Sequence, residues 1–296
     1  MRRGINLGNR LDALPARPVP DAWFDLVRDA GFDTVRLPVR WPAHAAATAP
    51  YALDEPFARA VDAAVDAALR RGLTTIVDVH HYDAIQTAPG AHADRLVGLW
   101  AGIAARYADR SPALWLEPLN EPHGALDTPQ WNALLRRALA AIRAADPDRT
   151  VLIGPAPMND IHALPRLELP ADAHVRATVH YYAPLRFTHQ GAPWVDGADR
   201  WHDVGWGGDG RDGDADRAAV TADLERLAAH GAVFVGEFGT YERADLASRV
   251  RWTAHVRGEL DRLGLDWCYW DFATDFGVYD PTAGAWREPL RKALLP

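Results

Sequence analysis

The chain has 296 residues, of which 48% are hydrophobic, which is enough for a large globular core. Its formal net charge is −8, lysine is almost absent, and no block rich in lysine and arginine occurs. These features argue against nucleic acids and anionic membranes as partners. No stretch approaches the ~20 consecutive apolar residues of a membrane span.

Eight short apolar runs are expected to be β-strands, because they are rich in β-branched, leucine and aromatic residues and are too short for buried helices. They cover residues 4–8, 33–39, 73–80, 113–120, 150–155, 177–183, 232–239 and 265–272. Amphipathic segments between them predict helices at 21–31, 54–72, 94–108, 129–146, 215–231, 243–264 and 286–295. After the fifth strand only 160–167 remains for a helix, enough for one or two turns.

Local signals refine two of these segments. Asp21 is the expected N-cap of the first helix and Gly31 its expected end. The stretch 203–216, rich in glycine and aspartate, is expected to be a flexible loop before the seventh helix. A calcium loop is the less favoured alternative there, because the spacing does not match the EF-hand pattern.

The alternation of strands and helices predicts parallel strands with right-handed crossovers. Eight such units in a chain of this length favour a single-domain α/β fold over residues 1–296, a (β/α)8 or TIM barrel. The competing reading is a doubly wound nucleotide-binding fold. That fold lacks support, because neither G-x-G-x-x-G nor G-x-x-x-x-G-K-[ST] follows a strand.

The single cysteine, Cys268, excludes an intrachain disulfide and is expected to pack as a small buried hydrophobe. The N-terminal sequence MRRGINLGN lacks the apolar region of a signal peptide. We therefore expect either a cytoplasmic protein or a secreted domain whose leader has been removed. A monomer is expected.

Polar residues gather at the predicted carboxyl ends of the strands, which face a shared pocket in a barrel of this type. They are Arg36, Arg40, His80, His81, Asn120, Glu121, His180, Tyr182, Glu237, Trp270 and Asp271. An apolar core cannot solvate such groups, so their concentration there indicates a functional site.

Glu121 and Glu237 follow the fourth and seventh strands, and two carboxyl groups flanking one bond suit glycoside hydrolysis. The negative charge of one is expected to raise the pKa of the other. Arg36 is expected to pair with Glu237 and to keep it ionised, with a further hydrogen bond from Tyr182. Asn120 could bind a sugar 2-hydroxyl.

Three further expectations concern neighbouring side chains. His180 and Tyr182 lie two residues apart, share one face of a strand and can orient the carboxylates. Trp270 offers a flat platform for a sugar ring. His80 and His81 are adjacent and should face opposite sides of a strand, so we expect no shared metal ion and no cofactor.

Seven motifs, GINLGN, DTVRLPVRW, VDVHHY, LNEPHG, VHYYAP, GEFGTY and YWDF, occur in this order along nearly the whole chain. Together they resemble the signatures of glycoside hydrolase family 5, a large cellulase family. The resemblance implies that Glu121 is the acid/base and Glu237 the nucleophile. It also implies family active-site positions at Arg36, His80, Asn120, His180, Tyr182 and Trp270.

The stretch FTHQGAPWVDG is similar to the loop after the sixth strand in a bacterial endoglucanase branch that includes mannan-active members. That similarity implies sugar contacts by Asn9, Asp12, His81, His189 and Trp194. Asp271, beside Trp270, is a further expected substrate-binding residue. Met158 stands where related enzymes often carry a tryptophan, which puts one stacking subsite in doubt.

The activity implied by the resemblance is that of a retaining endo-β-1,4-glucanase, a cellulase that hydrolyses soluble β-glucans by double displacement. Its partner would be a β-linked oligo- or polysaccharide. A β-mannanase and a mixed-linkage β-glucanase stay open as alternatives. A catalytically inactive carbohydrate-binding barrel is disfavoured, because both acids are present and would then lack a purpose.

Overall fold

The computed structural model describes residues 1–296. Its strands β1 to β8 follow one another around a closed barrel, in chain order. The strands are Arg3–Asn6, Thr34–Leu37, Thr74–Asp78, Leu114–Glu117, Val151–Ile153, Val175–Tyr181, Phe234–Phe238 and Asp266–Tyr269. The predicted TIM barrel is confirmed, with strands shorter than expected at most ends.

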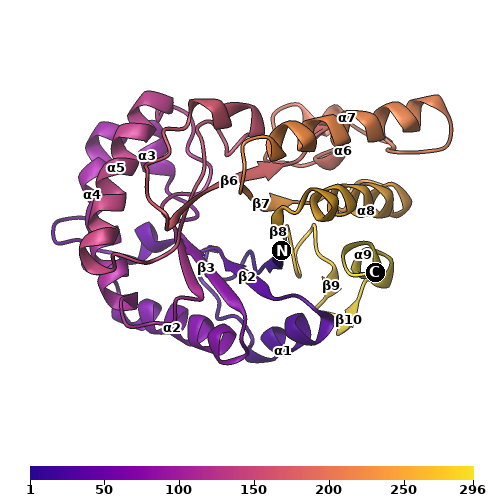
Figure 1. The fold of residues 1–296 in the computed structure, drawn as a ribbon. Coiled ribbons are helices and arrows are strands. Elements are labelled where there is room, and N and C mark those ends of the chain that lie inside the picture. Colours follow the sequence, from indigo (N-terminus) through magenta and orange to yellow (C-terminus); the bar gives the residue numbers. More distant parts are fainter. The chain divides into compact units, whose positions relative to one another are not determined.

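The chain groups into two compact units, which we call the Asn9–Val179 unit and the His180–Pro296 unit, the latter including Met1–Gly8. In the Asn9–Val179 unit, β2, β3, β4, β5 and the start of β6 pair in parallel. Its helices are α1 (Asp21–Ala30), η1 (Trp41–His44), α2 (Glu55–Arg70), α3 (Asp83–Thr87), α4 (Pro89–Tyr107), α5 (Thr128–Ala145) and η2 (Ile161–Arg166). Helices α4 and α5 pack side by side (Figure 1).

In the His180–Pro296 unit, β8 pairs in parallel with β1 on one side and β7 on the other. Its helices are α6 (Leu185–Thr188), η3 (Ala198–Arg200), α7 (Arg211–Ala228), α8 (Leu246–Leu263) and α9 (Glu288–Leu294). A hairpin of β9 (Tyr279–Asp280) and β10 (Ala285–Trp286) precedes α9. Helix α8 packs against both α7 and α9 (Figure 1).

Aspartate caps begin three of the long helices. The carboxylates of Asp54, Asp127 and Asp245 accept hydrogen bonds from backbone N–H groups of the first turns of α2, α5 and α8. The expected cap of α1 is wrong: Pro20 occupies the N-cap position, and Asp21 is the first helical residue. Gly31 ends α1 as expected, with a φ of 105° that favours glycine.

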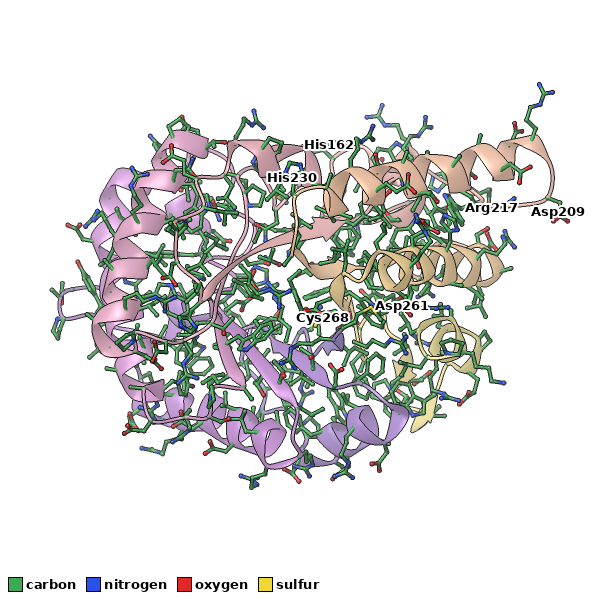
Figure 2. The ribbon with its side chains drawn as sticks, in the orientation of Figure 1. His162, Asp209, Arg217, His230, Asp261 and Cys268 are labelled. Atoms are coloured by element: carbon green, nitrogen blue, oxygen red, sulfur yellow. The ribbon has the colours of Figure 1, made fainter.

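The acidic stretch 203–216 is a loop only as far as Gly210. Helix α7 already begins at Arg211, so the end of the predicted loop is helical. Asp216 accepts a hydrogen bond from the N–H of Gly207 (2.9 Å), and Arg217 donates to the carbonyl oxygen of Gly207 (2.9 Å). Figure 2 shows Asp209 at the outer end of this loop, with Arg217 further along α7.

The remaining structural expectations concern the interior. Cys268 is buried in β8, as predicted. Gly239 follows β7 where a Cβ atom would lie 2.0 Å from the carbonyl oxygen of Trp270, so only glycine fits this close approach to the end of β8. None of the helices is long and apolar enough to span a bilayer.

Candidate active site

A buried ion-pair network joins three neighbouring strands of the Asn9–Val179 unit. Arg36 on β2 donates from Nε to Glu117 on β4 at 2.7 Å. Its Nη2 lies 2.7 Å from the Oδ2 of Asp78 on β3 and donates to the Oδ1 of Asn120 at 2.8 Å. Asp78 also accepts the backbone N–H of Val39 at 3.0 Å. All three charged side chains are fully buried, so each depends on the others for compensation of its charge.

The sequence patterns did not identify Asp78 and Glu117 as site residues. Each is a single acidic residue inside an apolar run, TIVDV and LWLEP. Acidic side chains are almost never fully buried unless they are paired. That signal could have pointed to a buried cation on an adjacent strand, and Arg36 is that cation.

His80 and His81 follow the end of β3, in the segment after Asp78. The Nδ1 of His80 lies 2.7 Å from the Oδ2 of Asp78, so this nitrogen donates to the carboxylate and the tautomer of the ring is set. Burial lowers the pKa of His81 to about 4, and the nearby charges of His80 and Arg40 act in the same direction. His81 is therefore neutral at working pH.

The expected separation of the two histidines is wrong. Their ring centroids are 4.6 Å apart, and one ligand atom each from Asp12, His80 and His81 lies within 4.8 Å of the others. The alternation of a strand does not apply, because both histidines lie beyond the last residue of β3. Asp12 is buried and accepts the N–H of Arg10 at 2.9 Å.

Glu121 follows β4 in an unusual backbone conformation, with a φ of 46°. Burial raises the pKa of its carboxyl group to about 7; Glu117 also raises it, whereas Arg36 and His123 oppose the rise. The expected direction of the shift is confirmed. The expected main cause is wrong, because desolvation rather than a neighbouring negative charge comes first.

Met158 lies close to the segment that carries Glu121. Its N–H donates to the carbonyl oxygen of Pro122 at 3.0 Å, and its side chain is 44% exposed. Met158 is therefore exposed beside the segment that carries Glu121, where a tryptophan would offer a stacking face.

Glu237 lies on β7 in the His180–Pro296 unit and is buried. The hydroxyl of Tyr182 donates to its Oε2 at 2.7 Å, and the Nδ1 of His180 lies 3.5 Å from the same oxygen. The hydrogen bond expected from Tyr182 is thus present, and both residues contact one carboxylate as their shared strand face predicted. A donor aimed at a carboxylate favours its ionised form. The expected pairing of Arg36 with Glu237 stays a prediction.

Aromatic side chains form a cluster beside Tyr182. The ring of His189 lies 4.9 Å from that of Tyr182, and burial lowers the pKa of His189 to about 4. Trp194 packs edge-on against Tyr241 at 4.9 Å and is still 55% exposed. A large aromatic face held by neighbours yet open to solvent is suited to stacking against a sugar ring.

The residues around β1 and β8 differ in exposure. Asp271 is fully buried, and its Oδ1 accepts hydrogen bonds from the N–H (3.1 Å) and hydroxyl (2.8 Å) of Thr274. The indole of Trp270 lies over Gly8, where a Cβ would come within 2.9 Å of the ring. Asn9 is exposed, with a φ of 57°. The sugar contacts expected of Asn9, Trp270 and Asp271 stay predictions.

Comparison with known proteins agrees with these features. A model of the cellulase family, glycosyl hydrolase family 5, matches residues 15–275. Endoglucanase H of Acetivibrio thermocellus is 32% identical over 98% of this chain and 31% of that protein. Cellulase/esterase CelE of the same organism is 30% identical over 94% of this chain and 36% of that protein. The chain thus spans about a third of the length of these two curated relatives.

Crystal structures give a match of the whole fold. Thermotoga maritima Cel5A in complex with mannotriose has a TM-score of 0.95 and 38% identity, over 99% of this chain and 97% of that chain. The same enzyme in complex with cellobiose gives the same TM-score of 0.95 and 38% identity. The cellulose synthase subunit Z of Clostridioides difficile has a TM-score of 0.93 and 31% identity over the full length of both chains.

Proposed function

Because the chain belongs to the cellulase family, glycosyl hydrolase family 5, we propose that residues 1–296 act as one retaining endo-β-1,4-glucanase domain. Glu121 is the general acid/base and Glu237 the nucleophile. The observation that carries this proposal is the contrast between their surroundings. Burial raises the pKa of Glu121 to about 7, whereas Glu237 accepts a hydrogen bond from Tyr182. One protonated and one ionised carboxyl group are what double displacement requires.

The reaction proceeds in two steps. A carboxylate oxygen of Glu237 attacks the anomeric carbon, and the glycosidic C–O bond breaks as Glu121 transfers its proton to the leaving oxygen. Glu121, now a carboxylate, then takes a proton from water as that water attacks the anomeric carbon and releases Glu237. Two inversions give net retention.

The network around Arg36 suggests how Asn120 recognises substrate. The amide oxygen of Asn120 accepts a hydrogen bond from Arg36, so its NH2 group is the part left to donate. We assign that donor to the sugar 2-hydroxyl oxygen. The Nδ1 of His80 faces the carboxylate of Asp78, and the Nδ1 of His180 faces the carboxylate of Glu237. We assign to each histidine the role of orienting the carboxylate that it faces.

Sugar binding is assigned to a set of aromatic and polar side chains. Trp270 and Trp194 supply stacking faces, and Asn9, Asp12, His81, His189 and Asp271 complete the expected substrate-binding set. His81 and His189 have lowered pKa values and are neutral, which suits uncharged carbohydrate. The partner is a β-linked oligo- or polysaccharide, bound by a monomer.

Mannan is the second candidate substrate, because Thermotoga maritima Cel5A has been crystallised with mannotriose as well as cellobiose. A reducing-sugar assay on carboxymethyl cellulose, barley β-glucan, glucomannan and galactomannan tests the choice. Activity on the first three supports the glucanase. Activity on galactomannan and glucomannan without activity on carboxymethyl cellulose or β-glucan would make the enzyme a mannanase. Binding without hydrolysis of any of them would indicate an inactive barrel.

The stereochemical outcome is a separate test. Proton NMR of the first product released from a β-glucan is expected to show the β-anomer, which mutarotates later. An initial α-anomer would contradict double displacement.

A further inference from the structure

Gln86 of α3 is a buried polar residue that the mechanism above does not use. Its side chain is 6% exposed, although α3 is a short helix of five residues, Asp83–Thr87. Both ends of its amide bind the segment that follows β4. The Oε1 accepts the N–H of His123 at 2.8 Å, and the Nε2 donates to the carbonyl oxygen of Glu121 at 3.5 Å.

The backbone of Gln86 makes a third tie to the same segment. Its carbonyl oxygen accepts the N–H of Ala125 at 2.7 Å. Gly124 has a φ of 65°, and a Cβ there would lie 2.6 Å from that carbonyl oxygen. The segment after Glu121 therefore lies directly against α3, and only glycine permits this approach.

The residue held in this way is strained. Glu121 has a φ of 46°, a left-handed conformation that costs free energy for any residue with a side chain and persists only where neighbours enforce it. Its carbonyl oxygen accepts from two side chains, the Nε2 of Gln86 and the ring Nδ1 of His123 at 2.6 Å. These contacts fix the peptide after Glu121, and hence the direction in which its carboxyl group leaves the backbone.

We propose that Gln86 is a positioning residue for the general acid/base: it holds Glu121 in its left-handed conformation and so aims the carboxyl group at the leaving oxygen. This rests on the acid/base role proposed above for Glu121. Small displacements of a catalytic group cost large factors in rate, because proton transfer needs hydrogen-bonding geometry. The contribution of Gln86 is therefore specific to steps in which a proton is transferred.

Aryl β-cellobiosides with leaving groups of different acidity separate this role from a general structural one. Gln86→Met has similar length but no hydrogen bonds. It is expected to lower kcat/KM by about tenfold or more for a phenyl-type leaving group that needs protonation. For 2,4-dinitrophenyl β-cellobioside, whose leaving group needs no acid, kcat/KM is expected to be unchanged.

Gln86→Glu provides a second variant with a different readout. It keeps an acceptor for the N–H of His123 but places an oxygen against the carbonyl oxygen of Glu121, where the amide had donated. The same loss for poor leaving groups is expected. The added negative charge should also raise the pKa of Glu121, so the alkaline limb of kcat/KM should move to higher pH.

Asn132 on α5 offers a matched control. Its buried amide also joins a helix to a loop, because it donates to the carbonyl oxygen of Arg166 (3.0 Å) and accepts the N–H of Glu168 (3.3 Å). Asn132→Leu is expected to lower thermal stability without changing the dependence of kcat/KM on the leaving group.

Glu121→Ala, measured in parallel, separates the positioning role of Gln86 from the acid/base role of Glu121. If Glu121→Ala loses activity selectively for poor leaving groups and Gln86→Met does not, the role of Gln86 is refuted while the acid/base assignment stands. An equal loss of all aryl substrates in both Gln86 variants would likewise refute it. If Glu121→Ala shows no selectivity, the assignment and the inference both fail.

Discussion

Removing the ionisable group of Glu121 is expected to stabilise the protein at alkaline pH. Burial raises the pKa of this carboxyl group from 4.5 to about 7. The folded protein therefore binds this proton more tightly than the unfolded chain does. The free energy of unfolding loses this contribution as pH rises from about 4.5 through about 7, and the loss is complete above that range. At about 1.36 kcal/mol per unit, the shift corresponds to roughly 3 kcal/mol.

Glu121→Gln retains the shape of the side chain and cannot ionise. At pH 8 the variant is expected to be more stable than the wild type by up to about 3 kcal/mol. At pH 4 the glutamine of the variant and the glutamic acid of the wild type are both neutral, so equal stability is expected. Urea unfolding at pH 4, 6 and 8 measures the difference. Glu242→Gln, which removes an exposed carboxylate from the loop after β7, is the control and should show no such trend.

The same pKa governs activity. Glu121 must carry its proton to act as an acid, so kcat/KM is expected to fall as pH rises through about 7, while the acid limb reports ionisation of Glu237. A Glu121→Gln variant with no added stability at pH 8, together with an alkaline limb far above pH 7, would refute the pKa of about 7 for Glu121.

The remaining predictions concern the other groups of the site. Azide should rescue Glu121→Ala with a β-glycosyl azide and Glu237→Ala with an α-glycosyl azide, and the same anomer from both would overturn the division of roles. A crystal structure of the enzyme is expected to place the two carboxyl groups ~5–5.5 Å apart, whereas about 9 Å would indicate inversion. Activity should survive dialysis against EDTA; loss that a divalent ion restores would direct attention to Asp12, His80 and His81. Arg36→Met should lower the free energy of unfolding by about 3–5 kcal/mol, because two carboxylates would stay buried without their cation.

Hydrophobic patterning was sufficient to predict the barrel. All eight strands and the long helices recur along the chain as apolar runs and amphipathic segments, whose periods are set by backbone geometry. Short elements lack such a signal. Helix α3 is five residues long and the strands β9 and β10 are two each, so tertiary packing rather than local pattern determines them.

Some contacts of the candidate site could be predicted from the sequence and others could not. His180 and Tyr182 both face the carboxylate of Glu237, as their two-residue spacing predicted, because the extended backbone of β6 continues one residue past Tyr181. The approach of His80 and His81 could not be predicted, because both lie beyond the end of β3, where no period applies. No sequence pattern indicated a role for Gln86. The role proposed for it rests on its contacts with Glu121 and on the backbone conformation of Glu121, which are visible only in three dimensions.

The buried network of Arg36, Asp78 and Glu117 also bears on how the barrel selects its own alignment during folding. Strands β2, β3 and β4 are buried along their whole length, so their apolar side chains do not distinguish one alignment of neighbouring strands from another. If one of these strands shifted by one residue against its neighbour, one of the three charged side chains would point toward the helix layer. Its counter-ion would then stay in the interior without a partner. Burying a charge without a partner costs several kcal/mol of folding free energy. The three charges therefore disfavour misaligned strand pairings that apolar side chains alone would permit.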